Sequence, residues 1–375
     1  MKIKLMIILI IAVAFIFNPN IVQASEPIDF FNNHMDILDF SEINSITNGA
    51  ETAYSINFSD IVARAISGDL DLSLSGILNS ALRIIFNEIF ENIGLLRNLL
   101  ILCILAALLK NLTDSFENKS VGEVGFYVSY IAVVIILFSS FIATIYILES
   151  FTTTLTTFIN ASIPIITILM VMSGNMTGGY VFSSILYFST GFITMLIRNF
   201  LIPLITIAST LQIVNHLTEN GMLKNFSELL KKIIEWTIKG VALVFMGVIT
   251  LQKISTPILN NLTVRTARST VNVVPVVGEV LTGAMDTVMS FISASKSGVL
   301  VAILITVIAF CVVPIIKLAA LYFIYKLVAS LVQPISDKRI VSCIDTMGNF
   351  TSLLLSCAVT ITVMFIFSVT LMLAF

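Results

Sequence analysis

Long runs of apolar residues, interrupted by short polar breaks, fill the chain from residue 95 to its end. The clearest run, residues 124–148, has 25 residues and no charge, and as a helix it would be about 37 Å long. Because the hydrocarbon core of a bilayer is about 30 Å thick, this run predicts a membrane-spanning helix. With the other runs the pattern predicts six to eight membrane segments, the others being residues 95–109, 163–172, 181–197, 201–214, 238–251, 299–332 and 350–375.

Several of these runs have the wrong length for one straight crossing. Residues 163–172 and 201–214 are short and lie close to Pro164 and Pro203, so we expect broken or re-entrant helices there. Residues 299–332 would form a helix of about 51 Å, well beyond a bilayer. We therefore expect a break in this run between Pro314 and Lys317.

An amphipathic helix is predicted over residues 221–239, GMLKNFSELLKKIIEWTIK. Glu228 and Lys232 are spaced for a favourable i,i+4 pair, and the chain's only tryptophan is Trp236. The helix either lies at the membrane surface, with Trp236 at headgroup depth, or forms the cytoplasmic overhang of the span at 238–251. Its four lysines indicate a cytoplasmic side on either reading.

The N-terminal part of the chain has the features of an exported segment. Two lysines precede thirteen apolar residues and a small-residue site ending at Ala24, which predicts a signal peptide over residues 1–24. Residues 25–94 follow as an acidic exported segment with few basic residues, which we expect to be helical from Asp60 onward. We interpret it as a solvated connector more than a dedicated binding module. Residues 95–375 then form the multi-spanning membrane domain.

A narrow polar stripe marks residues 271–298, VNVVPVVGEVLTGAMDTVMSFISASKSG. If Pro275 lies in the first turn, a rotation of 100° per residue places seven polar or small residues within about 40° of one line. They are Glu279, Thr282, Gly283, Asp286, Ser290, Ser293 and Ser297. We predict a helix of about five to six turns whose stripe faces a lumen, a partner helix or the membrane surface. Arg265 and Arg268 are candidate ion-pair partners for its two acids.

Five further charges lie in or beside apolar runs and are candidate intramembrane or interfacial groups: Lys317, Lys326, Asp337, Lys338 and Arg339. Lys326 must face protein, a water-filled cavity or an interface, because an ammonium at the bilayer centre costs a few kcal/mol. The triplet at 337–339 follows a proline turn and is typical of a positive-inside anchor.

Composition limits the classes of function. The chain is 57% hydrophobic and 11% charged, so lipid must be its main solvent and an all-α polytopic bundle is the expected fold. A formal net charge of −2 without clustered basic residues excludes a nucleic-acid-binding face. The two histidines and four cysteines have no metal-ligand spacing, and no phosphate loop or nucleophile motif is present. We therefore expect no catalytic, cofactor-binding or metal-binding residues.

Residues 265–350 resemble one family closely. The segments TARSTVNVVPVVGEVLTGAMDTV and IIKLAALYFIYKLVASLVQPISDKRIVSCIDTMG occur in one order before a long final span, as in the stage III sporulation protein AE family of endospore-forming bacteria. That family typically reads similarly to PVVGGALSDAVDTV, so Asp286 matches its second Asp while Gly283 takes the place of the first. Glu279 supplies an acid one turn earlier on the same face.

The resemblance implies a multi-pass subunit of the channel-like complex that joins mother cell and forespore. It would lie in the mother-cell membrane beside the other stage III sporulation AA to AH proteins, opposite the forespore protein Q, with its N-terminal segment outside the cytoplasm. The alternative is a stand-alone solute permease with Lys326, Glu279 and Asp286 as site groups. The paired short runs IPIITILM at Ile163 and IPLITIAS at Ile202 keep that alternative open.

Overall fold

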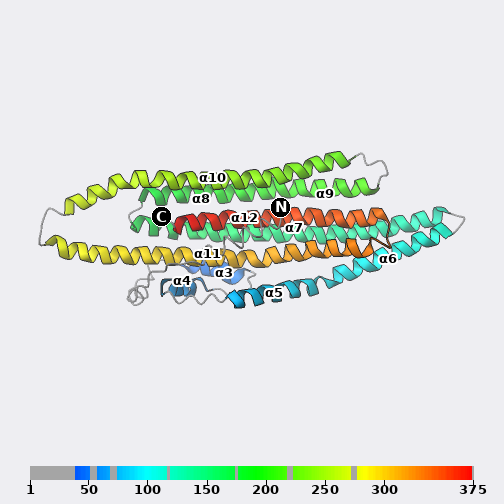
Figure 1. Ribbon diagram of the computed structural model, residues 1–375, viewed down its shortest axis with the longest axis horizontal. Helices are drawn as coiled ribbons and strands as arrows, with labels where there is room; N and C mark the ends of the chain where they lie inside the picture. Colours follow the sequence, from blue (N-terminus) through cyan, green and yellow to red (C-terminus); the bar gives the residue numbers. More distant parts are fainter. Residues whose placement is uncertain are drawn as a thin grey trace.

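The protein is a bundle of long α-helices that run along one common direction (Figure 1). The computed structural model describes residues 39–50, 57–67, 74–115, 119–173, 176–217, 223–271 and 277–373. Within these ranges the side chains of residues 74–81, 111–115, 119–123, 126, 176–177, 217, 251–294, 371 and 373 lie outside the described set. The described elements are α3 (Ser41–Gly49), α4 (Phe58–Ser67), α5 (Leu74–Glu91), α6 (Ile93–Ser115), α7 (Lys119–Met172), α8 (Met176–Leu196), the π-helix η2 (Ile197–Leu201), α9 (Ile202–Leu217), α10 (Lys224–Val271), α11 (Val277–Val332) and α12 (Lys338–Leu373). The signal-peptide prediction lies outside the described residues.

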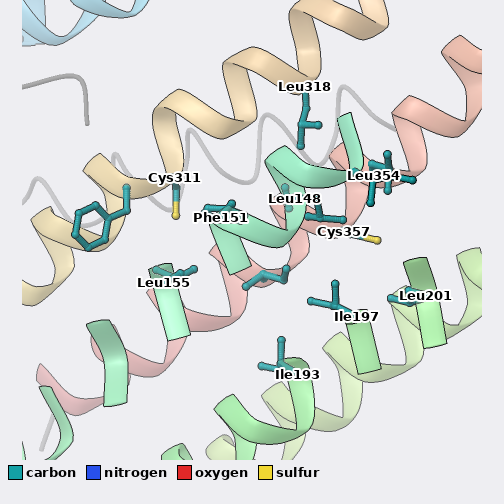
Figure 2. Packing of buried hydrophobic residues seen from close by; sticks show 14 of the residues in the cluster. Leu148, Phe151, Leu155, Ile193, Ile197, Leu201, Cys311, Leu318, Leu354 and Cys357 are labelled. Carbon is teal, nitrogen blue, oxygen red and sulfur yellow. The ribbon is translucent and has the colours of Figure 1, made fainter. Parts of the chain in front are cut away.

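Helices α7, α11 and α12 pack against one another and form the centre of the bundle. Helices α8, α9 and α10 cover one side of this centre, and α3 to α6 cover the other (Figure 1). The core between them is almost entirely apolar: Leu148 and Phe151 of α7 meet Ile193 and Ile197 on one side and Leu318 of α11 on the other (Figure 2). The expected all-α polytopic class is confirmed.

Six helical stretches among the described residues are long and apolar enough to cross a membrane, within the predicted six to eight. They are Ile93–Lys110, Tyr127–Met172, Gly178–His216, Lys224–Thr250, Ser295–Val332 and Lys338–Thr370. Two of these stretches belong to helices that are much longer than one crossing requires. Helix α7 has 54 residues and α11 has 56, which correspond to about 81 and 84 Å. Several runs that sequence patterning treats as separate segments are therefore parts of one helix.

The predicted broken helix at residues 163–172 is wrong. These residues are the last part of α7, which continues through Pro164 without interruption. The polar residues before them look like a break in sequence, but their hydroxyls bond within the helix: Thr156 donates to the Thr152 carbonyl at 2.8 Å and Ser162 to the Phe158 carbonyl at 2.8 Å. Hydroxyls bonded in this way cost little in an apolar environment, so the helix need not end.

The predicted break between Pro314 and Lys317 is also wrong, since α11 is continuous from Val277 to Val332. Pro314 removes one backbone hydrogen bond. Leu318 and Phe310, one turn to either side, are buried in the bundle core, and this packing holds the helix together across the proline. At Pro203 the chain also stays helical, because α8, the five-residue π-helix η2 and α9 follow one another without a gap. The predicted broken helix at 201–214 is therefore wrong, and the wider π-turn lies directly before the proline, which has no N–H to bond backward.

The amphipathic residues 224–239 continue directly into the next apolar run as part of α10. Leu230, Ile234 and Ile238 are buried against the bundle, whereas Trp236 is 77% exposed. This arrangement agrees with the prediction that these residues extend the span at 238–251 beyond the membrane, and not with a separate helix on the membrane surface.

The N-terminal helices α3 and α4 dock on the bundle instead of forming a solvated connector. Phe40, just before α3, contacts Phe58 of α4, which contacts Phe158 of α7, and Phe158 contacts Phe310 of α11, with ring centroids 5.1–6.1 Å apart. The side chain of Asn44 links α3 to α4 by accepting from the Phe58 N–H at 3.0 Å and donating to Ser59 Oγ at 2.8 Å. The connector interpretation is therefore wrong for residues 39–50 and 57–67.

Candidate functional site

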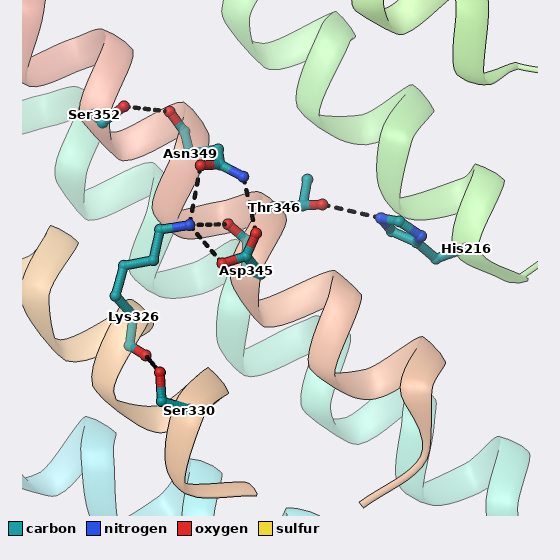
Figure 3. Close-up of polar contacts among 7 residues, drawn as sticks. All are labelled: His216, Lys326, Ser330, Asp345, Thr346, Asn349 and Ser352. Atoms are coloured by element: carbon teal, nitrogen blue, oxygen red, sulfur yellow. Dashed lines mark hydrogen bonds and ion pairs between the residues drawn. The ribbon is translucent and has the colours of Figure 1, made fainter. Parts of the chain in front are cut away.

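A charged cluster joins α11 to α12 near the turn between them (Figure 3). The ammonium of Lys326 lies 2.5 Å from Asp345 Oδ1 and donates to Asn349 Oδ1 at 3.0 Å. Asn349 in turn donates to Asp345 Oδ2 at 3.0 Å. Asp345 and Asn349 are four residues apart on α12, so both face the same side of that helix and hold the lysine between them.

Of the three environments expected for Lys326, the structure shows the first: its ammonium faces protein. Its side chain is 29% exposed and that of Asp345 is 47% exposed, so water reaches the pair from one side. Gly348 makes room for the lysine stem, since a Cβ at this position would lie 3.3 Å from Lys326 Cε and 3.3 Å from Tyr325 Cβ. The neighbouring Tyr325 is buried and donates to Ser140 Oγ of α7 at 2.7 Å.

A second polar contact of α12 is directed toward α9 and not toward α11. Thr346 follows Asp345 in sequence but turns toward α9, where its hydroxyl lies 2.9 Å from His216 Nε2 (Figure 3). Successive residues of α12 therefore connect it to α11 and to α9. Because the contacts are short and lie on three different helices, they fix how these helices align along the bundle.

The triplet at 337–339 lies at the turn between α11 and α12. Asp337 precedes α12 and accepts from the Arg339 N–H at 2.8 Å, as an N-cap does. Its other oxygen lies 2.5 Å from Lys110 Nζ, which joins α6 to this turn. Burial alone would raise the pKa of the Asp337 carboxyl, but the bonds from Lys110 and Arg339 outweigh it and hold the pKa below its usual range. Lys338 is exposed and Arg339 half-buried.

The predicted stripe residues occupy the N-terminal part of α11. The helix predicted there exists as backbone, but it is continuous with the rest of α11 and not a separate element of five to six turns. The side chains from Glu279 to Ser293 lie outside the described set, as do those of Arg265 and Arg268, so the direction of the stripe stays a prediction. Ser297 is exposed and adjoins Gly298, which packs closely on Ile66 of α4.

The structure brings Lys326 together with residues that sequence patterning did not single out. Asp345 and Asn349 lie just before an apolar run and have the spacing of one helical face, a signal that could have been found by pairing Lys326 with the first charge after the triplet at 337–339. Lys317, by contrast, lies about 13 Å farther along α11, at the edge of a separate cavity. The five candidate charges therefore do not form one site.

Comparisons with known proteins agree with the resemblance seen in the sequence. The family model described as stage III sporulation protein AE matches residues 56–375. The chain is 32% identical over 309 residues to "Stage III sporulation protein AE" of Bacillus subtilis (strain 168), covering 81% of this chain and 77% of that protein. No solved structure matches the chain.

Proposed function

Because the chain belongs to the stage III sporulation protein AE family, we propose that it is an integral membrane subunit of the channel-like complex between mother cell and forespore. It lies in the mother-cell membrane with its N-terminal segment outside the cytoplasm. Its partners are the other stage III sporulation AA to AH proteins and, across the space between the membranes, protein Q of the forespore. It acts by assembly and not by catalysis.

The observation that carries this proposal is the family match over residues 56–375, which includes every described candidate span. The helix arrangement supports it. The polar contacts of Lys326, Asp345, Thr346 and His216 connect helices of the bundle to one another. A connected bundle with a largely apolar exterior suits a subunit that others pack against.

The polar stripe of α11 is the part we assign to the conduit or to a subunit contact. It belongs to the family-matched region and begins near the first residue of α11, at one end of the bundle (Figure 1). Glu279 and Asp286 are two turns apart, so both acids would meet the same lumen or the same neighbour.

Replacing both acids tests the stripe. In an endospore-forming host that lacks the native gene, the chain carrying Glu279→Gln and Asp286→Asn should fail to support forespore development after engulfment. The matched control is Glu228→Gln with Glu235→Gln, which neutralises two acids on the amphipathic part of α10 and should sporulate normally. Spore counts, late forespore gene expression and membrane abundance of each variant are measured. Normal sporulation of the stripe variant would sink this role.

The permease alternative keeps one supporting observation, a charged cluster inside the bundle. A permease of this kind would need Lys326 and Asp345 to exchange partners with a solute. A Lys326→Gln variant that assembles with partner proteins but loses uptake of a solute would favour the permease. A variant that loses assembly would favour the subunit.

A further inference from the structure

Four charged residues on different elements lie at one level of the bundle, and we call them the charged belt: Glu149, Arg198, Lys239 and Lys317. Arg198 of η2 donates to Thr153 Oγ1 of α7 at 3.2 Å, one turn from Glu149. Ile197 and Ile238, the residues before Arg198 and Lys239, line one small hollow. Lys317 and Ser150, the residue after Glu149, line one cavity.

The belt lies between two uncharged stretches of α7. On this helix, 25 residues without charge precede Glu149 and 23 follow it, about 37 and 34 Å of helix. A hydrocarbon core of about 30 Å can cover only one of these stretches, and charges avoid its centre. Whichever stretch of α7 lies in the hydrocarbon, the belt is at its edge. Tyr146 and Trp236, 65% and 77% exposed within one turn of Glu149 and Lys239, are the aromatic residues expected at such an interface.

A cavity of about 260 Å³ opens at this level between α7, α11 and the residue that follows α3. One wall carries hydroxyls, because Tyr146, Ser150 and Thr154 are spaced by four residues on one face of α7. Among the described residues, Lys317 of α11 supplies the one charged side chain that lines it. The other lining residues are apolar: Ala50, Ile147, Phe151, Phe310 and Pro314. Tyr146 and Ser150 are exposed, so the cavity is open at the bundle surface.

The lining groups match a phosphate that carries hydroxyls. The ammonium and the three hydroxyls donate hydrogen bonds, and an ammonium has three donors to share. Pro314 has no N–H to give to the carbonyl of Phe310, four residues earlier, which leaves an acceptor at the same wall.

We propose that this cavity binds the phosphate headgroup of an anionic phospholipid, with Lys317 as the cation that selects it. The belt places the cavity at headgroup depth, and the apolar wall accepts the glycerol backbone and the start of the acyl chains. The volume is below the roughly 300–1,000 Å³ of sites that enclose a drug-sized ligand, so it takes a headgroup and not a whole lipid.

Native mass spectrometry of the full chain in detergent tests the proposal, with phosphatidylglycerol and phosphatidylcholine added at equal concentration. The wild-type chain should retain phosphatidylglycerol in preference. Lys317→Gln should lose that preference by about 10-fold or more, the loss expected for one charge-assisted hydrogen bond. Lys317→Arg should keep it. The matched control is Lys239→Gln, which removes a cation from the belt but not from the cavity, and should retain phosphatidylglycerol like the wild type.

Three outcomes would overturn the proposal. One is equal retention of phosphatidylglycerol by the wild type and Lys317→Gln, and another is an equal loss in Lys239→Gln, which would mean unspecific attraction to the belt. The third is protection of the folded chain against heat by inorganic phosphate alone, abolished by Lys317→Gln, without any lipid preference. If Lys317→Gln does not fold, Thr154→Val and Ser150→Ala together give the same test on the hydroxyl wall, with loss of phosphatidylglycerol retention expected and unchanged retention contradictory.

Discussion

The ammonium of Lys326 shows how this chain places a charge inside an apolar bundle. It is surrounded by two acceptors from α12, and the glycine at 348 lets its stem lie flat against that helix. Sequence patterning predicts that Lys326 needs protein, a cavity or an interface, but not which one. Asp345 and Asn349 come from another helix, and their distance from Lys326 depends on the turn at 333–337. The residue pairing therefore could not be read from the pattern of apolar and polar positions alone.

A double-mutant cycle measures the bond between Lys326 and Asp345. Each of Lys326→Met and Asp345→Ala should lower thermal stability in detergent, by about 1–2 kcal/mol, because each leaves the other charge without its main partner. Partial exposure of both side chains keeps the value at the low end for charged pairs. The double variant should lose clearly less than the sum. Additive losses would contradict the pairing, and Ser330→Ala, an exposed change one turn from Lys326, is the control.

Asp337 gives the turn a dependence on pH. Its folded-state pKa is held below the usual value near 4, so its ionised form stabilises the fold above that pH. The stabilisation is lost as the pH falls through the lowered pKa. We expect Asp337→Asn to be less stable than the wild type at pH 7, by about 1 kcal/mol at most because Lys110 is 46% exposed.

The measurement is the melting temperature of both proteins between pH 3 and pH 7. The difference between them should shrink toward zero at the acid end. A difference that grows on acidification, or one that is the same at every pH, would contradict the assignment. Lys110→Met should reproduce the loss at pH 7.

At the scale of elements, the pattern of apolar runs predicts where helices lie but not how long they are. Apolar runs locate the helices because each run must bury its backbone bonds in lipid or protein. They do not locate the ends, because a helix longer than the bilayer is acceptable when neighbouring helices cover its surface. The runs 124–148 and 163–172 merge into α7 for this reason, and 299–332 merges with the stripe segment into α11.

The docking of α4 on α11 gives an element-scale prediction. A Cβ on Gly298 would lie 2.3 Å from Ile66 Cγ1 and 3.4 Å from the Ile66 backbone nitrogen, so a larger residue must displace α4. Gly298→Leu should therefore increase trypsin cleavage after Arg64, which lies on α4. Gly240→Leu on α10, where a Cβ would meet nothing within 4 Å, should leave cleavage unchanged. Equal cleavage in both variants would show that α4 does not pack at Gly298.

At the scale of the whole molecule, the bundle is taller than one bilayer. The exterior of α7 is apolar on both sides of the charged belt, with exposed apolar side chains from Val124 to Met172. Lipid can cover only part of this height. In the proposed assembly, other protein chains would cover the remaining apolar surface.

The most direct test of the proposed assembly is purification of a tagged chain from sporulating cells in mild detergent. Mass spectrometry then quantifies the partners, and the same chain purified alone is reconstituted in liposomes. The proposed assembly predicts that other stage III sporulation proteins co-purify in fixed ratio, and that the isolated chain transports nothing by itself. A stable, partner-free chain that moves a solute across liposomes would contradict it.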